Sequence, residues 1–251
     1  MNEFKTWRSY PDFSRVVKNK SRYFRDENIE QFLKTILSTS ENRKFDLPNK
    51  RYLWRAQLGH GWMPVYQEDE YVTDIPAPFP PNRMKPLVRE AAEGRANPKG
   101  IPYLYLATTK ETAMAEVRPW LGSKISVGQF ETKKAMVLIN CTVHQKETPW
   151  YFDEPDAEKK EQAVWADIDK AFSKPITVND RIADYIPTQI IAEFFKTQGF
   201  DGIFYRSMLG EGYNVVLFDI KSATLVNCSL YEVKNISFDF QIAASPYAVK
   251  K

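Results

Sequence analysis

Residues 97–120, NPKGIPYLYLATTKETAMAEVRPW, decide the fold because they predict a strand, a tight turn and a helix in immediate succession. Residues 101–107 are apolar and aromatic, as expected of a strand. The two-residue period of a strand places Tyr103 and Tyr105 on the same face. An aromatic face therefore leads directly into the turn that starts the helix.

The helix that follows is marked at both ends. The run from Thr108 to Glu111 has the spacing of a capping box, so we expect the helix to begin near Thr109 and to end before Pro119. A helix N-terminus offers free N–H groups that suit a phosphate. Glu116 lies on the last turn, where it can face inward beside the preceding strand.

Outward from this stretch, helices and strands are mixed without a regular strand–helix–strand repeat, which predicts an α+β fold. The Pro- and Gly-rich residues 58–100 predict a long irregular connection, of a kind that is usually functional. We expect further strands over 51–56, 135–143 and 202–205, a hairpin of strands near 214–219 and 223–230, and helices over 153–172 and from Pro187 to Thr197, with Gly199 as a C-terminal cap.

The first 45 residues predict a small helical appendage. Ile29, Phe32, Leu33 and Ile36 fall on one helical stripe, and nothing in the segment suggests chemistry. We therefore divide the chain into an N-terminal helical segment, 1–45, and a main domain, 46–251.

Chain length, composition and charge limit the classes of protein to which this sequence can belong. A chain of 251 residues with 43% hydrophobic and 27% charged residues suits one globular core. No stretch reaches the roughly 20 apolar residues of a membrane span, and the N-terminus lacks an apolar signal region, so we expect a cytoplasmic protein with no membrane partner. Residues 1–55 hold 13 Lys/Arg and 7 Asp/Glu, a net of +6 within a total of +3. This skew favours a solvated basic face over direct nucleic-acid binding.

The supply of cysteine and histidine excludes several kinds of site. Two Cys and two His occur, scattered singly, with no CxxC or HExxH motif, so a structural metal site is not expected. Cys141 and Cys228 lie in strand-like runs and are expected to be reduced thiols. No GxSxG motif is present for a serine hydrolase. Carboxylate, arginine and aromatic chemistry remains.

Three blocks carry candidates for that chemistry. Arg55 lies in an apolar strand beside Trp54, where a buried guanidinium needs either an anionic ligand or a carboxylate partner. Glu116 with Tyr105 offers a carboxylate beside an aromatic face. Ser207 follows a strand at the edge of a turn, where its hydroxyl suits a phosphate or a ribose.

These blocks, in this order, resemble the RES domain, a bacterial family named for its Arg, Glu and Ser. The matching residues are Arg55, Glu116 and Ser207, and the resemblance covers most of the stretches 97–120 and 185–218. It implies an ADP-ribosyltransferase-like fold that takes NAD⁺ as a substrate, with no metal and no resident cofactor. It also implies a toxin that pairs with a helix-turn-helix antitoxin.

The resemblance and the residues together predict the roles of the site. Arg55 is expected on the pyrophosphate, Tyr105 on the nicotinamide and Glu116 on the ribose, as the catalytic set, while Ser207, Arg95 and Asn214 are expected to contact substrate. The family implies an NAD⁺ phosphorylase or glycohydrolase, with inorganic phosphate or water as acceptor. Two alternatives stay open: a transferase that moves ADP-ribose to a protein, and a non-catalytic nucleotide-binding module.

Overall fold

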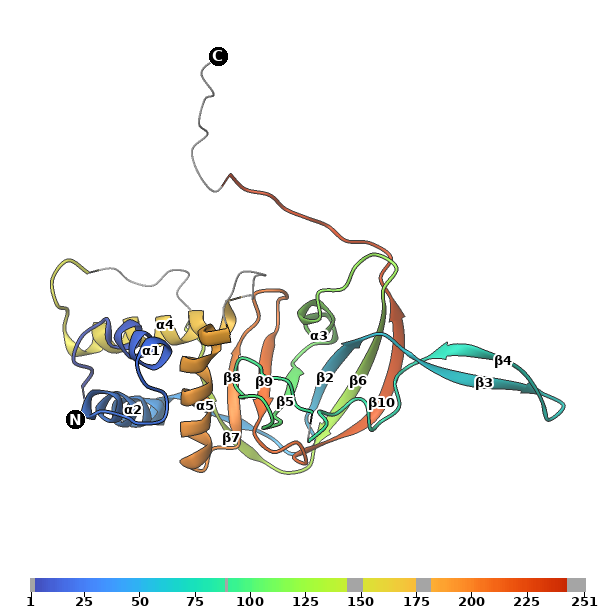
Figure 1. The fold of residues 1–251 in the computed structure, drawn as a ribbon, viewed down its shortest axis with the longest axis horizontal. Coiled ribbons are helices and arrows are strands. Elements are labelled where there is room, and N and C mark those ends of the chain that lie inside the picture. Colours follow the sequence, from blue (N-terminus) through green and yellow to red (C-terminus); the bar gives the residue numbers. More distant parts are fainter. Residues whose placement is uncertain (1–2, 89, 144–150, 175–181, 243–251) are drawn as a thin grey trace, which may run out of the picture.

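The computed structural model describes residues 3–88, 90–143, 151–174 and 182–242 (Figure 1). An eight-stranded mixed sheet runs in the order β1-β7-β8-β9-β5-β2-β6-β10, and β3 and β4 form a separate two-stranded sheet. The predicted α+β fold is confirmed. The strands are β1 (Lys44–Leu47), β2 (Tyr52–Leu58), β3 (Gly61–Gln67), β4 (Glu70–Ala77), β5 (Leu104–Ala107), β6 (Lys124–Thr132), β7 (Met136–Asn140), β8 (Gly202–Arg206), β9 (Tyr213–Leu217) and β10 (Ala223–Glu232).

The helices lie in two places relative to this sheet. Figure 1 shows α1, α2, α4 and α5 gathered on the β7–β8 side, whereas α3 lies beside β2 and β5. The helical elements are α1 (Ser9–Asn19), α2 (Glu27–Ser40), α3 (Lys110–Glu116), α4 (Ala157–Ser173) and α5 (Ile186–Thr197), with short 3₁₀ turns at Glu41–Arg43 and Ile182–Tyr185. None of the helices in the described part of the chain is long and apolar enough to cross a bilayer.

The strand–turn–helix unit forms in the predicted order, but the strand is shorter than the predicted 101–107, since β5 begins at Leu104, and the helix starts one residue later. The N-cap is Thr109, whose side chain accepts a hydrogen bond from the Thr112 backbone N–H, so α3 begins at Lys110. In α5, Pro187 stands in the first turn, and Gly199 follows the helix with a φ of 88°, as predicted.

The predicted hairpin of the last two strands is wrong. β9 lies between β8 and β5, while β10 pairs with β6 at the far edge of the sheet. The reason is burial: Val215, Val216 and Leu217 of β9 are fully buried, so this strand sits in the centre and uses both of its edges for other partners. A short turn in sequence therefore does not fix which strands pair.

The prediction of an irregular connection over 58–100 is also wrong for its first part, where β3 and β4 form a hairpin. Both strands contain a proline, Pro64 in β3 and Pro76 in β4, although proline cannot donate a ladder hydrogen bond. In a two-stranded ribbon each strand has one open edge, so a missing N–H can face that edge without breaking the pairing.

The N-terminal helices share the core of the main domain. Phe13 and Phe32 stack with ring centroids 4.5 Å apart and belong to one buried cluster with Trp165 of α4 and Ile191 of α5. The predicted inner face of α4 is confirmed, since Val164, Trp165, Ile168 and Phe172 are fully buried. The division at residue 45 stays a prediction.

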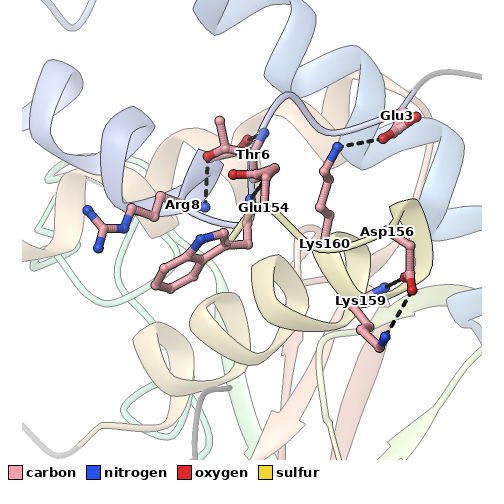
Figure 2. A network of polar contacts seen from close by, with 9 residues as sticks. Glu3, Thr6, Arg8, Glu154, Asp156, Lys159 and Lys160 are labelled. Carbon is pink, nitrogen blue, oxygen red and sulfur yellow. Dashed lines mark hydrogen bonds and ion pairs between the residues drawn. The ribbon is translucent and has the colours of Figure 1, made fainter. Parts of the chain in front are cut away.

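Polar contacts tie the start of the chain to α4 and to the segment before it (Figure 2). Lys160 Nζ lies 2.7 Å from Glu3 Oε1, and Glu154 Oε1 accepts a hydrogen bond from the Trp7 backbone N–H at 2.9 Å. Asp156 caps α4 by accepting from the Lys159 N–H. Exposed ion pairs contribute little stability, so the apolar cluster is the main reason that this segment stays packed.

Candidate active site

The predicted catalytic residues meet in one cleft. Arg55 comes from β2, Tyr105 from β5 and Glu116 from the end of α3. β2 and β5 are neighbours in the sheet, and α3 follows β5 after a short turn, so the fold brings the three together. The cleft has a volume of about 540 Å³. It is lined by these three residues, by Arg95 and Asn214, and by Trp54, Ala56, Gly94, Leu106, Ala107, Ala113, Val117, Arg118, Phe172, Ser173, Tyr205 and Leu209.

Arg55 is a cation without a carboxylate partner in the part of the chain that the structure describes. Its Nη1 donates to the Tyr105 backbone oxygen at 3.1 Å, and its buried Nε has no hydrogen-bond partner among the described residues. Burial lowers the pKa of Arg55 to about 10, which leaves the group charged at neutral pH. The alternative of a buried salt bridge is therefore absent from the described residues, and a desolvated guanidinium faces the cleft.

Glu116 is held by one of its two oxygens. Oε1 accepts a hydrogen bond from Ser207 Oγ at 2.7 Å and another from Asn214 Nδ2 at 2.7 Å. Within the described residues, Oε2 has no hydrogen-bond or ionic partner, and Glu116 lines the cleft. The carboxylate is thus fixed in orientation and keeps one oxygen for a ligand.

Ser207 contacts the Glu116 carboxylate and is not among the residues that line the cleft. It is buried, and its Oγ also accepts hydrogen bonds from the Leu209 and Gly210 N–H groups at 3.1 and 3.2 Å. One donated and two accepted bonds use the full capacity of a hydroxyl. Its predicted contact with substrate stays a prediction, while its contact with Glu116 is direct. Asn214 lies in the cleft wall and serves the same carboxylate.

Tyr105 is fixed by its hydroxyl. The Tyr105 OH donates to Asn97 Oδ1 at 2.7 Å and accepts from the Ala96 N–H at 2.9 Å. Burial raises the pKa of Tyr105 well above its usual range, so the phenol stays neutral. A Cβ on Gly94 would lie 2.6 Å from this hydroxyl, so glycine is required for the loop to pass so close. The ring is therefore a rigid part of the cleft wall.

Arg95 lines the cleft but directs its guanidinium to the end of α4. Its Nη1 donates to the Ala171 oxygen at 2.6 Å, and its Nη2 donates to the Lys174 oxygen. A cation there satisfies carbonyls that a helix end leaves free. Its predicted role at a phosphate stays a prediction.

Sequence reasoning missed residues that shape the cleft from α4 and α5. Phe172 and Ser173 form part of the wall at the end of α4, and no sequence signal linked them to the site. Thr188 Oγ1 donates to the Arg95 oxygen, and Gln189 Nε2 donates to the oxygens of Gly94 and Asn97. Both residues lie in the stretch 185–218 that resembles the family, but only the structure shows that they hold the loop of Gly94 to Asn97.

A second cavity of about 440 Å³ adjoins the cleft and shares Arg55, Gly94 and Tyr105 with it. Arg83 and Lys85 also line it. Lys85 Nζ donates to the backbone oxygens of Ile220 and Ala223. No group of three His, Cys, Asp or Glu side chains suited to a metal ion occurs within the described ranges.

Comparison with known proteins places this arrangement in a family. The sequence matches the family model described as the RES domain over residues 53–241. The chain belongs to the RES domain family. Arg55, Glu116 and Ser207, which carried the resemblance, all fall within the matched RES domain, as do Arg95, Tyr105 and Asn214.

Two further comparisons were made, with solved structures and with curated proteins, and they give one remote likeness and no match, respectively. Among solved structures it is similar to the crystal structure of the M. tuberculosis MbcT–MbcA toxin–antitoxin complex, with a TM-score of 0.39 and 11% identity. That likeness covers 79% of this chain and 91% of the other. A search of the curated proteins finds no match.

Proposed function

We propose that this RES domain protein cleaves the nicotinamide–ribose bond of NAD⁺ by phosphorolysis or hydrolysis and acts as a toxin. One observation carries the proposal: the same cleft is lined by a desolvated guanidinium with no carboxylate partner and by a carboxylate with one oxygen left unbonded, both among the residues that the structure describes. NAD⁺ offers a matching pair of groups, a pyrophosphate for the cation and a ribose for the carboxylate. Membership of the RES family supports the same substrate.

Arg55 binds the pyrophosphate in this mechanism. A guanidinium forms paired, charge-assisted hydrogen bonds with phosphate oxygens, and these bonds are strengthened where water is excluded. The part of the guanidinium that lines the cleft supplies the donors. Binding an anion also offsets the cost of keeping this cation buried.

Glu116 and Tyr105 act at the bond that breaks. The Tyr105 ring packs against the flat nicotinamide, and the free Oε2 of Glu116 binds the ribose and offsets the positive charge that develops as nicotinamide leaves. Ser207 and Asn214 are positioning residues, because they hold the carboxylate through Oε1. Nicotinamide leaves with the electron pair of the C–N bond, so the enzyme supplies no proton to it.

The acceptor forms the new bond to the ribose. With water, the products are nicotinamide, ADP-ribose and a proton; with inorganic phosphate, they are nicotinamide and a phosphorylated ADP-ribose. The second cavity supports phosphate as the acceptor, because its lining holds three cations, Arg55, Arg83 and Lys85, against two carboxylates, Glu90 and Glu93.

The test is incubation of purified protein with NAD⁺, with and without inorganic phosphate, with nicotinamide and the ADP-ribose product followed by mass. Nicotinamide release that requires phosphate, with a product heavier by one phosphate, is the expected result. Release without phosphate identifies a glycohydrolase. No release under either condition contradicts the proposal and favours transfer to a protein or a binding-only role.

The family resemblance also supports a helix-turn-helix antitoxin as a partner and a cytoplasmic site of action. The expected result is growth arrest with a fall in cellular NAD⁺ when this chain is expressed alone, and recovery when the antitoxin gene is expressed with it. Growth unaffected by the chain, in cells where the protein is shown to accumulate, contradicts the toxin role.

A further inference from the structure

The β3–β4 hairpin stands away from the rest of the molecule (Figure 1). Among the described residues its two strands pair only with each other, and all residues of both strands are exposed or half-buried. An isolated two-stranded hairpin is at best marginally stable in water, because it has no apolar face packed on a core. A surface that covers one face of this ribbon would therefore stabilise it.

One face of the hairpin is aromatic. Trp62, Pro64 and Tyr66 alternate along β3 and share a face, and Tyr66 is paired with Tyr71 across the ribbon. The two tyrosine rings lie 6.1 Å apart in an edge-on arrangement. Trp62, Tyr66 and Tyr71 are 64%, 60% and 58% exposed, which is unusual for a contiguous set of large aromatic side chains. Trp and Tyr are the side chains most enriched at the centres of protein interfaces.

The hairpin is also strongly acidic. Residues 61–77 contain Glu68, Asp69, Glu70 and Asp74 and no Lys or Arg. Glu68 and Asp69 form the turn with φ values of 52° and 67°, a conformation for which Asn-Gly is the favoured pair. Non-glycine residues with positive φ strain the backbone, so the turn geometry does not explain why Glu68 and Asp69 are there. A contact between their charges and a partner surface does.

A complementary surface lies at the other end of the same chain. The loop of residues 20–25, between α1 and α2, holds Lys20, Arg22 and Arg25 and no acidic residue. Its Tyr23 and Phe24 are each 88% exposed. Arg25 Nη1 is 3.9 Å from Glu30, whereas Lys20 and Arg22 point to solvent without an ion pair among the described residues.

We infer that copies of this chain associate head to tail, with the acidic aromatic hairpin of one copy bound to the basic aromatic loop 20–25 of the next. The two surfaces match in charge, and arginine packs well on exposed Trp and Tyr rings. Figure 1 places α1 and α2 at one end of the long axis and β3–β4 at the other, so the surfaces of one copy do not meet each other. Such a contact joins two different patches and builds rings or open chains. The inference does not depend on the proposed reaction.

The test measures the mass of the full chain in solution by light scattering across a wide range of protein concentration, at low and high salt. The wild type is expected to rise above the 29.2 kDa of one chain as concentration increases, and to return towards it at high salt. Reversal of the tip, E68K/D69K/E70K, and reversal of the loop, K20E/R22E/R25E, are each expected to give a monomer.

Mixing the two variants separates this arrangement from others. A reversed tip faces a reversed loop, and a native tip faces a native loop, so the mixture is expected to regain the higher mass. Trp62→Ser, which removes an aromatic side chain from the hairpin face, is expected to weaken association. Its control is Trp120→Ser, which removes an aromatic side chain that is 73% exposed outside both surfaces and should associate as the wild type does. Thermal unfolding of each variant checks that it folds.

Three results would overturn the inference. They are a wild type that stays monomeric at every concentration, a loop variant that associates as strongly as the wild type, and a mixture that stays monomeric although both variants fold. A wild type that stays monomeric would mean that any partner of the hairpin is a different protein. The second would favour contact between two hairpins.

Discussion

Replacing Glu116 by glutamine removes a charge from the cleft and leaves the local hydrogen bonds in place. Oε1 accepts from Ser207 and Asn214, and a glutamine oxygen in the same position accepts both. Only Oε2, which has no protein partner among the described residues, becomes an amide. We therefore expect the free energy of unfolding to change by less than about 1 kcal/mol.

The loss of activity should be much larger than the loss of stability. If the free oxygen offsets charge only as the nicotinamide bond breaks, removing that charge costs about 3–4 kcal/mol in the transition state, or about 10²–10³ in kcat, with little change in KM. Glu116→Ala should add a structural penalty of about 1–3 kcal/mol, because Asn214 and Ser207 then keep buried donors without an acceptor.

The assay is nicotinamide release under saturating NAD⁺, with thermal unfolding of the same preparations. Glu111→Gln is the matched control, since Glu111 lies on the same helix with a side chain that is 72% exposed, and it should leave kcat unchanged. A Glu116→Gln enzyme with wild-type kcat would refute a catalytic charge at this position. Equal losses of stability in the Gln and Ala variants would refute the hydrogen-bond argument.

Four further results are expected. Arg55→Ala should weaken NAD⁺ binding by about 2–4 kcal/mol, measured as KM or by calorimetry, and unchanged affinity would remove Arg55 from the phosphate site. Gly94→Ala should displace Tyr105, because the new Cβ would lie 2.6 Å from its hydroxyl, and should lower both the melting temperature and kcat/KM; a wild-type enzyme would show that the loop yields. Burial raises the pKa of both thiols, but Cys141 is fully buried and Cys228 is partly exposed, so alkylation near pH 8 should label Cys228 first, as detected by mass spectrometry; labelling of Cys141 first would show that the segment directly after β7 opens. Dialysis against a chelator should leave nicotinamide release unchanged, since the proposed chemistry uses no metal, and loss that is restored by a metal ion would contradict it.

Sequence alone determined the elements whose signals are local. The strand, turn and helix around Tyr105 and Glu116 follow from alternation, a threonine cap and a terminating proline, all within one short stretch. The inner face of α4 follows from helical spacing in the same way. The order of the Arg55, Glu116 and Ser207 blocks pointed to the family, and the family model confirms it.

Only the tertiary structure decided which side chains meet. Ser207 and Asn214 are 91 and 98 residues from Glu116 in sequence. They reach its carboxylate because β9 lies beside β5 in the sheet and β8 lies beside β9. Arg95 had the residue type of a phosphate ligand, but its loop places it at the end of α4. Strand order and loop position depend on long-range packing. The central strand β9 pairs with both β8 and β5, so β10 pairs with β6 instead. Local sequence patterns specify an element and its buried face. The partner of a polar side chain depends instead on which distant segments the packing of the whole core places next to it.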